Sequence, residues 1–287
     1  MGEEGRVSFF SKSKIACPVC KASFFREELL TGRGRLIAGR LTKDLRRIYD
    51  PSQKFGKVYP LIYPVVVCPS CYYAAFASDF HELADTSRRA LELDADRRLE
   101  QVFLLFDEVD FREPRSLKEG VAGYLFALMC YDQFPDEACP TIKQGLAALR
   151  AAWVASDLEV ERPGENWSYL AQLFYRKAHF FYTAAIDYEQ SGKESIGTVP
   201  HLGPDLDKNY GYDGVLYLAA YLELQYGPRE DEEKRIASLK YARRTVARIF
   251  GLGRASRDKP TALLDLAREL YDTIGVELTR MGVHGET

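Results

Sequence analysis

The sequence predicts a mainly α fold, in which a TPR-like helical-repeat domain follows a small β module. Two observations lead to this prediction. From about Phe80 onward, apolar residues recur at spacings of three and four, as in helices with one buried face. Before Phe76 the pattern is one of short strands and loops, with four cysteines in two CxxC pairs. We therefore expect two domains, residues 1–78 and 79–287, in a chain long enough to bury a sizeable core.

The cysteine pairs are the strongest local signal. Cys17 and Cys20 form a CPVC motif, and Cys68 and Cys71 form a CPSC motif. Each motif places two sulfurs on one side of a tight turn, and two facing turns supply four thiolates for a tetrahedral Zn²⁺. We predict a structural Zn²⁺ in a zinc-ribbon-like module, with iron in the same cage or a disulfide pair as alternatives. Four thiolates leave no position for water, so the predicted ion stabilises the fold and hydrolyses nothing.

Two features depart from a compact zinc ribbon. The motifs are separated by 47 residues, so the segment between them must form an elaborated loop or a small subdomain. Lys21 and Tyr72 follow the second cysteine of each motif, where glycine is frequent, so either both accept a tight turn or the turn differs. The other cysteines, Cys130 and Cys139, lie in helix-like sequence and are predicted to be small buried apolar residues.

The run of valines at 65–67 predicts a strand that leads into the second motif. Five apolar stripes at helical spacing follow. They consist of Leu99, Val102, Phe103 and Phe106; of Ile142, Leu146, Leu149 and Trp153; of Trp167, Leu170, Ala171, Phe174, Ala178, Phe181 and Ala185; of Ile236, Leu239, Ala242, Val246 and Ile249; and of Leu263, Ala267, Leu270, Ile274 and Leu278. Leu173 and Phe180 lie off the third stripe, so that helix is predicted to be sandwiched between neighbours. Consecutive helices with short turns predict stacked antiparallel pairs, as in tetratricopeptide repeats.

The connection at residues 191–214 is unusually long and contains five glycines and two prolines. We expect a solvent-exposed insertion, with a functional loop as the alternative. Asp205, Asp207 and Asn209 alternate like the start of a calcium-binding loop. Leu216 stands where such a loop needs glutamate, so we reject calcium.

The uncharged stretch at 58–78 is long enough to cross a membrane, but three prolines would leave backbone groups unpaired in lipid. The N-terminal residues include early acids and no apolar core of a secretory signal. We therefore expect a cytoplasmic protein without membrane insertion.

Residues 17–80 resemble an uncharacterised bacterial family known as domain of unknown function 2225. The resemblance rests on the CPVC motif, Gly34-Arg35-Leu36, Asp44, Tyr59-Pro60-Leu61, the run from Val67 to Phe76 with its CPSC motif, and Asp79-Phe80. It implies a zinc-binding N-terminal module joined to TPR-like helices, with Cys17, Cys20, Cys68 and Cys71 as the ligands. Tyr72 departs from the glycine that usually follows the second motif. The resemblance implies no established activity.

Charge is divided unevenly along the chain. The formal net charge is −3, but residues 1–76 carry +7 and the remainder −10. Basic residues crowd the segment between the motifs, namely Arg33, Arg35, Arg40, Lys43, Arg46 and Arg47. A second basic segment, residues 234–257, contains eight basic residues and no acid. These segments suit nucleic acid through phosphate contacts. The acidic overall balance and the lack of a recognition-helix motif favour instead a solvated face or a surface that pairs with the acidic helical part.

Enzyme motifs are absent from the sequence. The four histidines, His81, His179, His201 and His284, lie in no HExxH motif and beside no nucleophile motif. We expect His179 to be a hydrogen-bonded structural residue and His81 to be a polar residue at a helix start, with a spare metal ligand as the alternative. We therefore expect no enzymatic activity.

Stacked helix pairs present a concave surface that suits a peptide or a partner helix. The sequence therefore predicts a non-catalytic adaptor or scaffold that binds other proteins within a larger bacterial assembly. The candidate contact surfaces are the aromatic helices, residues 234–257 and the glycine-rich loop. The alternative is a nucleic-acid-associated protein that acts through the basic zinc module.

Overall fold

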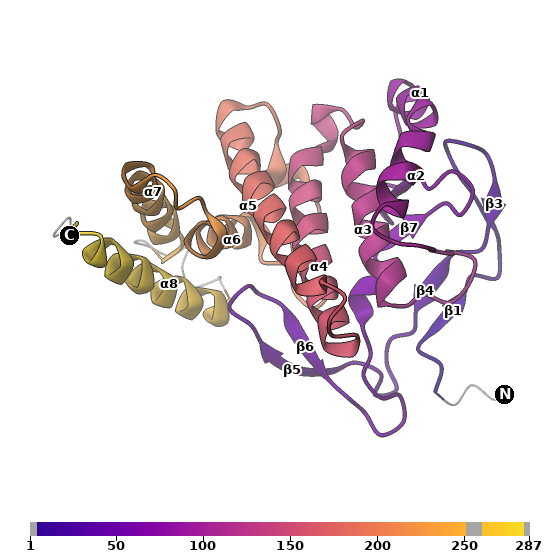
Figure 1. Ribbon diagram of the computed structural model, residues 1–287, viewed down its shortest axis with the longest axis horizontal. Helices are drawn as coiled ribbons and strands as arrows, with labels where there is room; N and C mark the ends of the chain where they lie inside the picture. The colour runs from indigo at the N-terminus through magenta and orange to yellow at the C-terminus, as the bar shows by residue number, and fades with distance from the viewer. Residues whose placement is uncertain (1–4, 251–259, 284–287) are drawn as a thin grey trace.

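The computed structural model describes residues 5–250 and 260–283. Short strands form the N-terminal part, and the described residues contain eight α-helices after it (Figure 1). The predicted mainly α fold with a small N-terminal β module is confirmed. Buried side chains from Cys17 to Leu278 form one continuous cluster, so the module and the helices share a core. The division into domains at residue 78 stays a prediction.

The strands pair as four separate antiparallel two-stranded sheets. The pairs are β1 (Ser8–Phe10) with β4 (Glu27–Leu29), β2 (Ile15–Ala16) with β3 (Ser23–Phe24), β5 (Ile37–Leu41) with β6 (Arg47–Asp50), and β7 (Val65–Val67) with β8 (Ala74–Phe76). The valine run is therefore a strand, as predicted, and it is buried throughout. The uncharged stretch at 58–78 holds a 3₁₀ turn (Pro60–Ile62), β7 and β8 instead of a spanning helix. In the part of the chain that the structure describes, no helix combines the length and apolarity needed to cross a bilayer.

The helices follow one another along the molecule. They are α1 (Asp85–Leu93), α2 (Ala95–Phe103), α3 (Leu117–Tyr131), α4 (Pro140–Glu161), α5 (Trp167–Ser191), α6 (Gly211–Tyr226), α7 (Glu232–Phe250) and α8 (Thr261–Arg280). From α3 to α8 each helix packs on the next one in the chain, which is the nearest-neighbour arrangement of a TPR-like array. The strands lie against this array, with β7 and β8 on α3 and the β5–β6 hairpin beneath α4, reaching toward α8 (Figure 1).

Local sequence sets several helix ends. Ser116 and Glu119 form a capping box at the start of α3. The Ser116 side chain accepts a hydrogen bond from a backbone N–H of the first turn, and the Glu119 carboxylate accepts one from the backbone N–H of Ser116. Pro140 opens α4, where its missing N–H costs no intrahelical hydrogen bond. Gly192 ends α5 in the left-handed conformation that suits glycine.

The predicted helical stripes are buried or half-buried in α4, α7 and α8, but the stripe in α2 is partly wrong. Val102 is buried, whereas Phe103 is 38% exposed and Phe106 lies beyond the end of the helix. Arg98 lies on the buried face of α2 instead, and its exposed fraction is 0%. Its guanidinium donates hydrogen bonds to the carbonyls of Leu91 and Cys71, which is why a charged residue can be buried there.

The prediction that α5 is sandwiched holds for its main stripe, since α5 packs on both α4 and α6. Phe180 departs from it and is 63% exposed. Two neighbouring helices cover two sides of α5, and Phe180 lies on a side that neither covers.

The long connection at 191–214 is not the exposed insertion that we expected, because its centre from Leu202 to Asp205 is buried. Arg150 donates hydrogen bonds to the carbonyls of Gly203 and Pro204 at 3.1 and 2.8 Å. These bonds satisfy backbone acceptors that burial would otherwise leave unpaired. Asp205 accepts a hydrogen bond from the backbone N–H of Arg47 at 2.7 Å, so the connection is docked onto β6.

Candidate metal centre

Two hairpin turns with the same backbone pattern carry the four cysteines. Cys17 and Cys20 lie in the turn between β2 and β3, and Cys68 and Cys71 in the turn between β7 and β8. The first cysteine of each turn donates its N–H to a carbonyl five residues later, at 2.9 Å in both turns. Its own carbonyl accepts the N–H of the residue after the second cysteine, at 3.0 and 2.9 Å. This pattern turns both sulfurs of a pair to one side.

The residue after each motif adopts the left-handed conformation. Lys21 has φ of 64° and Tyr72 has φ of 55°, so the prediction that both accept a tight turn is confirmed. An L-residue in this conformation costs roughly 1–2 kcal/mol relative to a right-handed one. The Tyr72 ring packs against the rings of Phe126 and Phe111, with centroids at 5.1 and 6.3 Å. This aromatic packing explains why tyrosine stands where glycine would be unstrained.

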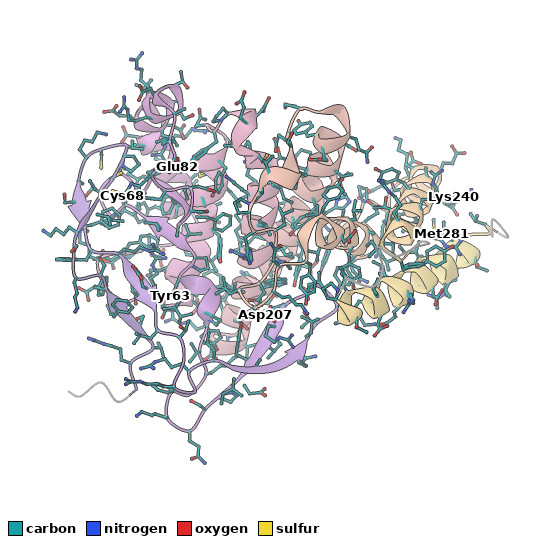
Figure 2. All side chains as sticks on the ribbon, turned by 180° about the vertical axis from the view of Figure 1, so that it is seen from behind. Tyr63, Cys68, Glu82, Asp207, Lys240 and Met281 are labelled. Atoms are coloured by element: carbon teal, nitrogen blue, oxygen red, sulfur yellow. The ribbon has the colours of Figure 1, made fainter. Side chains whose placement is uncertain are left out.

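The two turns face each other, and their sulfurs form a compact cluster. The Sγ atoms of Cys17 and Cys71 are 3.7 Å apart, those of Cys20 and Cys68 are 3.6 Å apart, and all four lie within 4.8 Å of one another. A tetrahedral ion with metal–sulfur bonds of about 2.3 Å separates its ligands by about 3.8 Å. A disulfide needs about 2.0 Å, and all six cysteines are free. The donor set and its spacing therefore fit a four-thiolate metal site (Figure 2 labels Cys68).

Protonation within the cluster is uneven. Hydrogen bonds from the thiols of Cys17 and Cys71 lower the pKa of Cys68 to about 2. The hydrogen bond to Cys68 raises the pKa of Cys17 to about 12, and hydrogen bonds to Cys17 and Cys68 raise the pKa of Cys71 strongly. These shifts arise because the sulfurs share hydrogen bonds at short range. A bound cation would replace the shared protons and allow the remaining thiols to ionise.

Two arginines hold the second turn from outside. Arg98 donates to the carbonyl of Cys71 at 3.2 Å, and Arg112 donates to the carbonyl of Pro69 at 3.1 Å. Four thiolates around a divalent ion carry a net double negative charge, so these guanidinium groups also supply compensating positive charge. Arg98 joins the turn to α2, and this contact had no signature in the sequence.

The other candidate residues lie apart from the cluster. His81 is exposed and precedes the start of α1 at Asp85, so it neither joins the sulfurs nor opens the helix as expected. His179 is hydrogen-bonded as predicted, with its Nε2 atom 2.6 Å from a carboxylate oxygen of Glu223. Cys130 and Cys139 are buried, as predicted. His284 lies outside the described residues.

Asp44, at the tip of the β5–β6 hairpin, joins the N-terminal part to the helices. Its carboxylate accepts hydrogen bonds from the indole N–H of Trp153 at 2.6 Å and the hydroxyl of Tyr175 at 3.1 Å. Next to it, the carbonyl of Lys43 accepts a hydrogen bond from Tyr217 at 2.6 Å. The hairpin tip therefore occupies the aromatic face of α4, α5 and α6. In the sequence, Asp44 stood out only through the family resemblance.

The basic residues between the motifs pair mainly within the molecule. Lys43 forms an ion pair with Glu269 on α8 and Arg46 one with Asp157 on α4. Arg47 pairs with Asp207 at 2.8 Å, which engages one acid of the calcium-like loop. Arg35 is buried, with its guanidinium 4.5 Å from the ring centroid of Phe55. For Lys43, Arg46 and Arg47 the basic surface pairs with acids of the helical part, one of the alternatives left open above.

Comparison with known proteins places this architecture among bacterial proteins. The model of a family described as "Uncharacterized protein conserved in bacteria (DUF2225)" matches residues 10–274. An uncharacterized protein of Borreliella burgdorferi is 41% identical over 277 residues, which is 96% of this chain and 99% of that protein. No solved structure matches the chain.

Proposed function

The chain belongs to the bacterial DUF2225 family, and from its site and its fold we propose that it is a non-catalytic adaptor or scaffold that binds other proteins within a larger assembly. Its N-terminal module is held by one structural Zn²⁺ bound by Cys17, Cys20, Cys68 and Cys71.

The closed four-cysteine cluster is the observation that carries this proposal. Four sulfurs within 4.8 Å of one another fill a tetrahedral coordination sphere, so a bound ion has no open position for a substrate or a reactive water. Such a site contributes its binding free energy to folding. This supports a structural ion rather than a catalytic one.

The helical array supports the adaptor function. Each helix packs mainly on its neighbours in the chain, so the faces that the N-terminal strands do not cover stay available. Large apolar side chains lie exposed where α2 ends and α5 begins, among them Leu104, Leu105 and Tyr169. Leu105 and Tyr169 line one groove of about 500 Å³. Exposed apolar groups gathered around a groove are typical of protein-binding surfaces.

Metal analysis of the purified chain tests the zinc site. We expect about one zinc ion per chain from elemental analysis, since one tetrahedral cluster binds one ion. Cys17→Ser and Cys68→Ser each remove a ligand and are expected to lose the metal. Cys139→Ala is the matched control, because this buried cysteine lies outside the cluster. Wild-type zinc in both serine variants would refute the ligand assignment, and stoichiometric iron would refute zinc.

Affinity purification with quantitative mass spectrometry tests the adaptor function. The tagged chain, expressed in its own bacterium, is expected to retain a reproducible set of proteins after nuclease treatment. An empty set would overturn the proposal.

The nucleic-acid alternative has a direct test as well. Arg33 and Arg40 are among the exposed basic residues between the motifs. Salt-sensitive binding of DNA or RNA that is lost in the Arg33→Glu, Arg40→Glu variant would favour the alternative. We expect no affinity even at low salt.

A further inference from the structure

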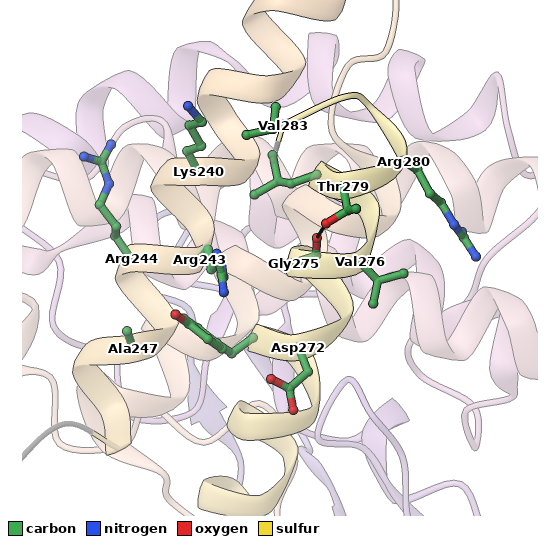
Figure 3. A pocket seen from close by; sticks show the side chains of 12 residues that line it. Lys240, Arg243, Arg244, Ala247, Asp272, Gly275, Val276, Thr279, Arg280 and Val283 are labelled. Carbon is green, nitrogen blue, oxygen red and sulfur yellow. Dashed lines mark hydrogen bonds between the residues drawn. The ribbon is translucent and has the colours of Figure 1, made fainter. Parts of the chain in front are cut away.

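A groove of about 830 Å³ lies between α7 and α8. Its basic side chains come from both helices, with Lys240, Arg243 and Arg244 on α7 and Arg280 on α8 (Figure 3). Asp272 is the one acid among the residues that line it. The lining therefore holds four basic side chains and one acid in a chain whose formal net charge is −3, and Arg280 also pairs with Glu277 outside the lining at 3.4 Å.

We propose that this groove binds an acidic amphipathic segment of a partner protein. The inference rests on the adaptor function proposed above and gives the chemistry of the partner that the adaptor would bind.

The lining of the groove combines charge with apolar surface. Ala247, Val276 and Val283 line it together with the cations, and Val276 is 54% exposed. An occupant that places carboxylates on the cations and apolar side chains on the valines satisfies both parts of this lining. A segment with acids on one face and apolar residues on the other has this pattern.

Arg243 is held in position for such an occupant. Its guanidinium lies 4.2 Å from the ring centroid of Tyr271. It also lies about 3.5 Å from the position that a Cβ atom would take at Gly275, which is ordinary van der Waals distance. A guanidinium stacked on a ring is preorganised for a planar carboxylate, which lowers the entropy lost on binding.

The same stack argues against a nucleic acid in this groove. Proteins bind single strands by stacking bases on aromatic faces above a basic channel. Tyr271 is the aromatic residue in the lining, and the guanidinium of Arg243 covers one of its faces. The exposed valine beside the cations likewise offers nothing to a phosphate backbone. A carboxylate-bearing peptide fits this surface better.

The dimensions suit a short helix. On α8 the lining runs from Tyr271 to Arg280. At 1.5 Å per residue this stretch is about 15 Å long, which matches about three turns of a partner helix.

The binding test uses the full, metal-loaded chain and a fluorescein-labelled peptide of glutamate and leucine at helical spacing. A matched peptide with lysine in place of glutamate is the charge control. Fluorescence anisotropy is expected to show binding of the glutamate peptide alone, with affinity that falls as salt is added. The double variant Arg244→Glu, Arg280→Glu should lower the affinity for the glutamate peptide about tenfold or more, since two of the four cations are replaced by anions that repel it.

A control variant makes the same change of net charge elsewhere. Lys12→Glu with Arg89→Glu alters two exposed residues, one before β2 and one on α1, and is expected to bind like wild type. Val276→Ser keeps every cation and removes exposed apolar surface, so it should weaken binding even if the double charge reversal does not fold. Thermal melting checks that each variant is folded.

Two results would overturn the groove assignment. One is equal peptide binding by the groove variant and the control variant. The other is tighter binding of poly-uridine RNA than of the glutamate peptide. The affinity purification described above keeps this failure distinct from that of the adaptor function. Partners retained equally by wild type and by the groove variant refute the groove alone, whereas an absence of partners from wild type refutes the adaptor.

Discussion

Replacement of Asp44 by alanine tests whether the β5–β6 hairpin fastens the N-terminal part to the helical array. Asp44 is 8% exposed and accepts hydrogen bonds from Trp153, Tyr175 and the hydroxyl of Thr42. Alanine leaves the indole N–H and the phenol hydroxyl without their acceptor, in a site that water does not readily reach. Each donor then bears a desolvation cost that the native fold avoids.

The expected cost follows from these contacts. A hydrogen bond to a charged group contributes roughly 1.5–3 kcal/mol, so the loss of two such bonds costs about 3–6 kcal/mol. Trp153 and Tyr175 both donate to Oδ2, so the amide oxygen of Asn can accept both bonds, and Asn is expected to cost less than alanine. Domains are typically stable by about 5–15 kcal/mol, so Asp44→Ala should remove a large share of the stability.

Urea denaturation, followed by the fluorescence of the two tryptophans, measures this loss. In the Trp153→Phe background, Asp44→Ala should cost about 1–3 kcal/mol less, because one donor has already been removed. Metal content is expected to stay at the wild-type level, since none of the four cysteines contacts Asp44 through a hydrogen bond. A cost below about 1 kcal/mol, or strict additivity in the double-mutant cycle, would refute this role of the hairpin.

Four further substitutions give opposed or pH-dependent outcomes. Lys21→Gly should raise the free energy of unfolding in urea by up to about 1 kcal/mol, because glycine tolerates the left-handed turn. Tyr72→Gly should lower it, because it also removes a half-buried ring that packs on Phe126 and Phe111; equal effects would refute the packing argument. Arg98→Met leaves two buried carbonyls without donors, so we expect a loss of about 2–5 kcal/mol and faster metal release to a chelator; unchanged release would contradict its link to the cluster. Burial alone would raise the pKa of Glu223. Its hydrogen bonds and charge interactions with His179 and Arg235 instead lower this pKa below the ordinary 4.5. The stabilisation by this carboxylate is therefore present above about pH 4.5 and is lost as pH falls through the lowered pKa, so the difference in Tm between wild type and Glu223→Gln should shrink in acid; a constant difference would contradict the shift.

The features that the sequence predicts correctly are those with a local pattern. The CPVC and CPSC motifs define their own turns, and a tetrahedral ion requires two such turns to face each other, so the clustering of Cys17, Cys20, Cys68 and Cys71 could be predicted. The stripe from Ile142 to Trp153 is likewise buried, because the period of a helix alone determines which residues share its face.

The features that the sequence does not reveal depend on contacts between distant segments. Asp44 is one acid in a tight turn, and nothing near it in the chain indicates the indole and phenol that it binds. Arg98 reads as a solvated residue, yet it is buried because carbonyls from two other segments accept its hydrogen bonds. The centre of the glycine-rich connection is buried for a similar reason, since Arg150 reaches its carbonyls from α4.

The hairpin tip on the aromatic face has a consequence for how this protein meets other molecules. The tip belongs to the same polypeptide as the helices that it contacts, so its effective concentration there is on the order of millimolar. A competing peptide at micromolar abundance would need far higher affinity to displace this tethered occupant. The hairpin tip therefore covers that face of the helices, and a partner protein would have to bind the outward surfaces.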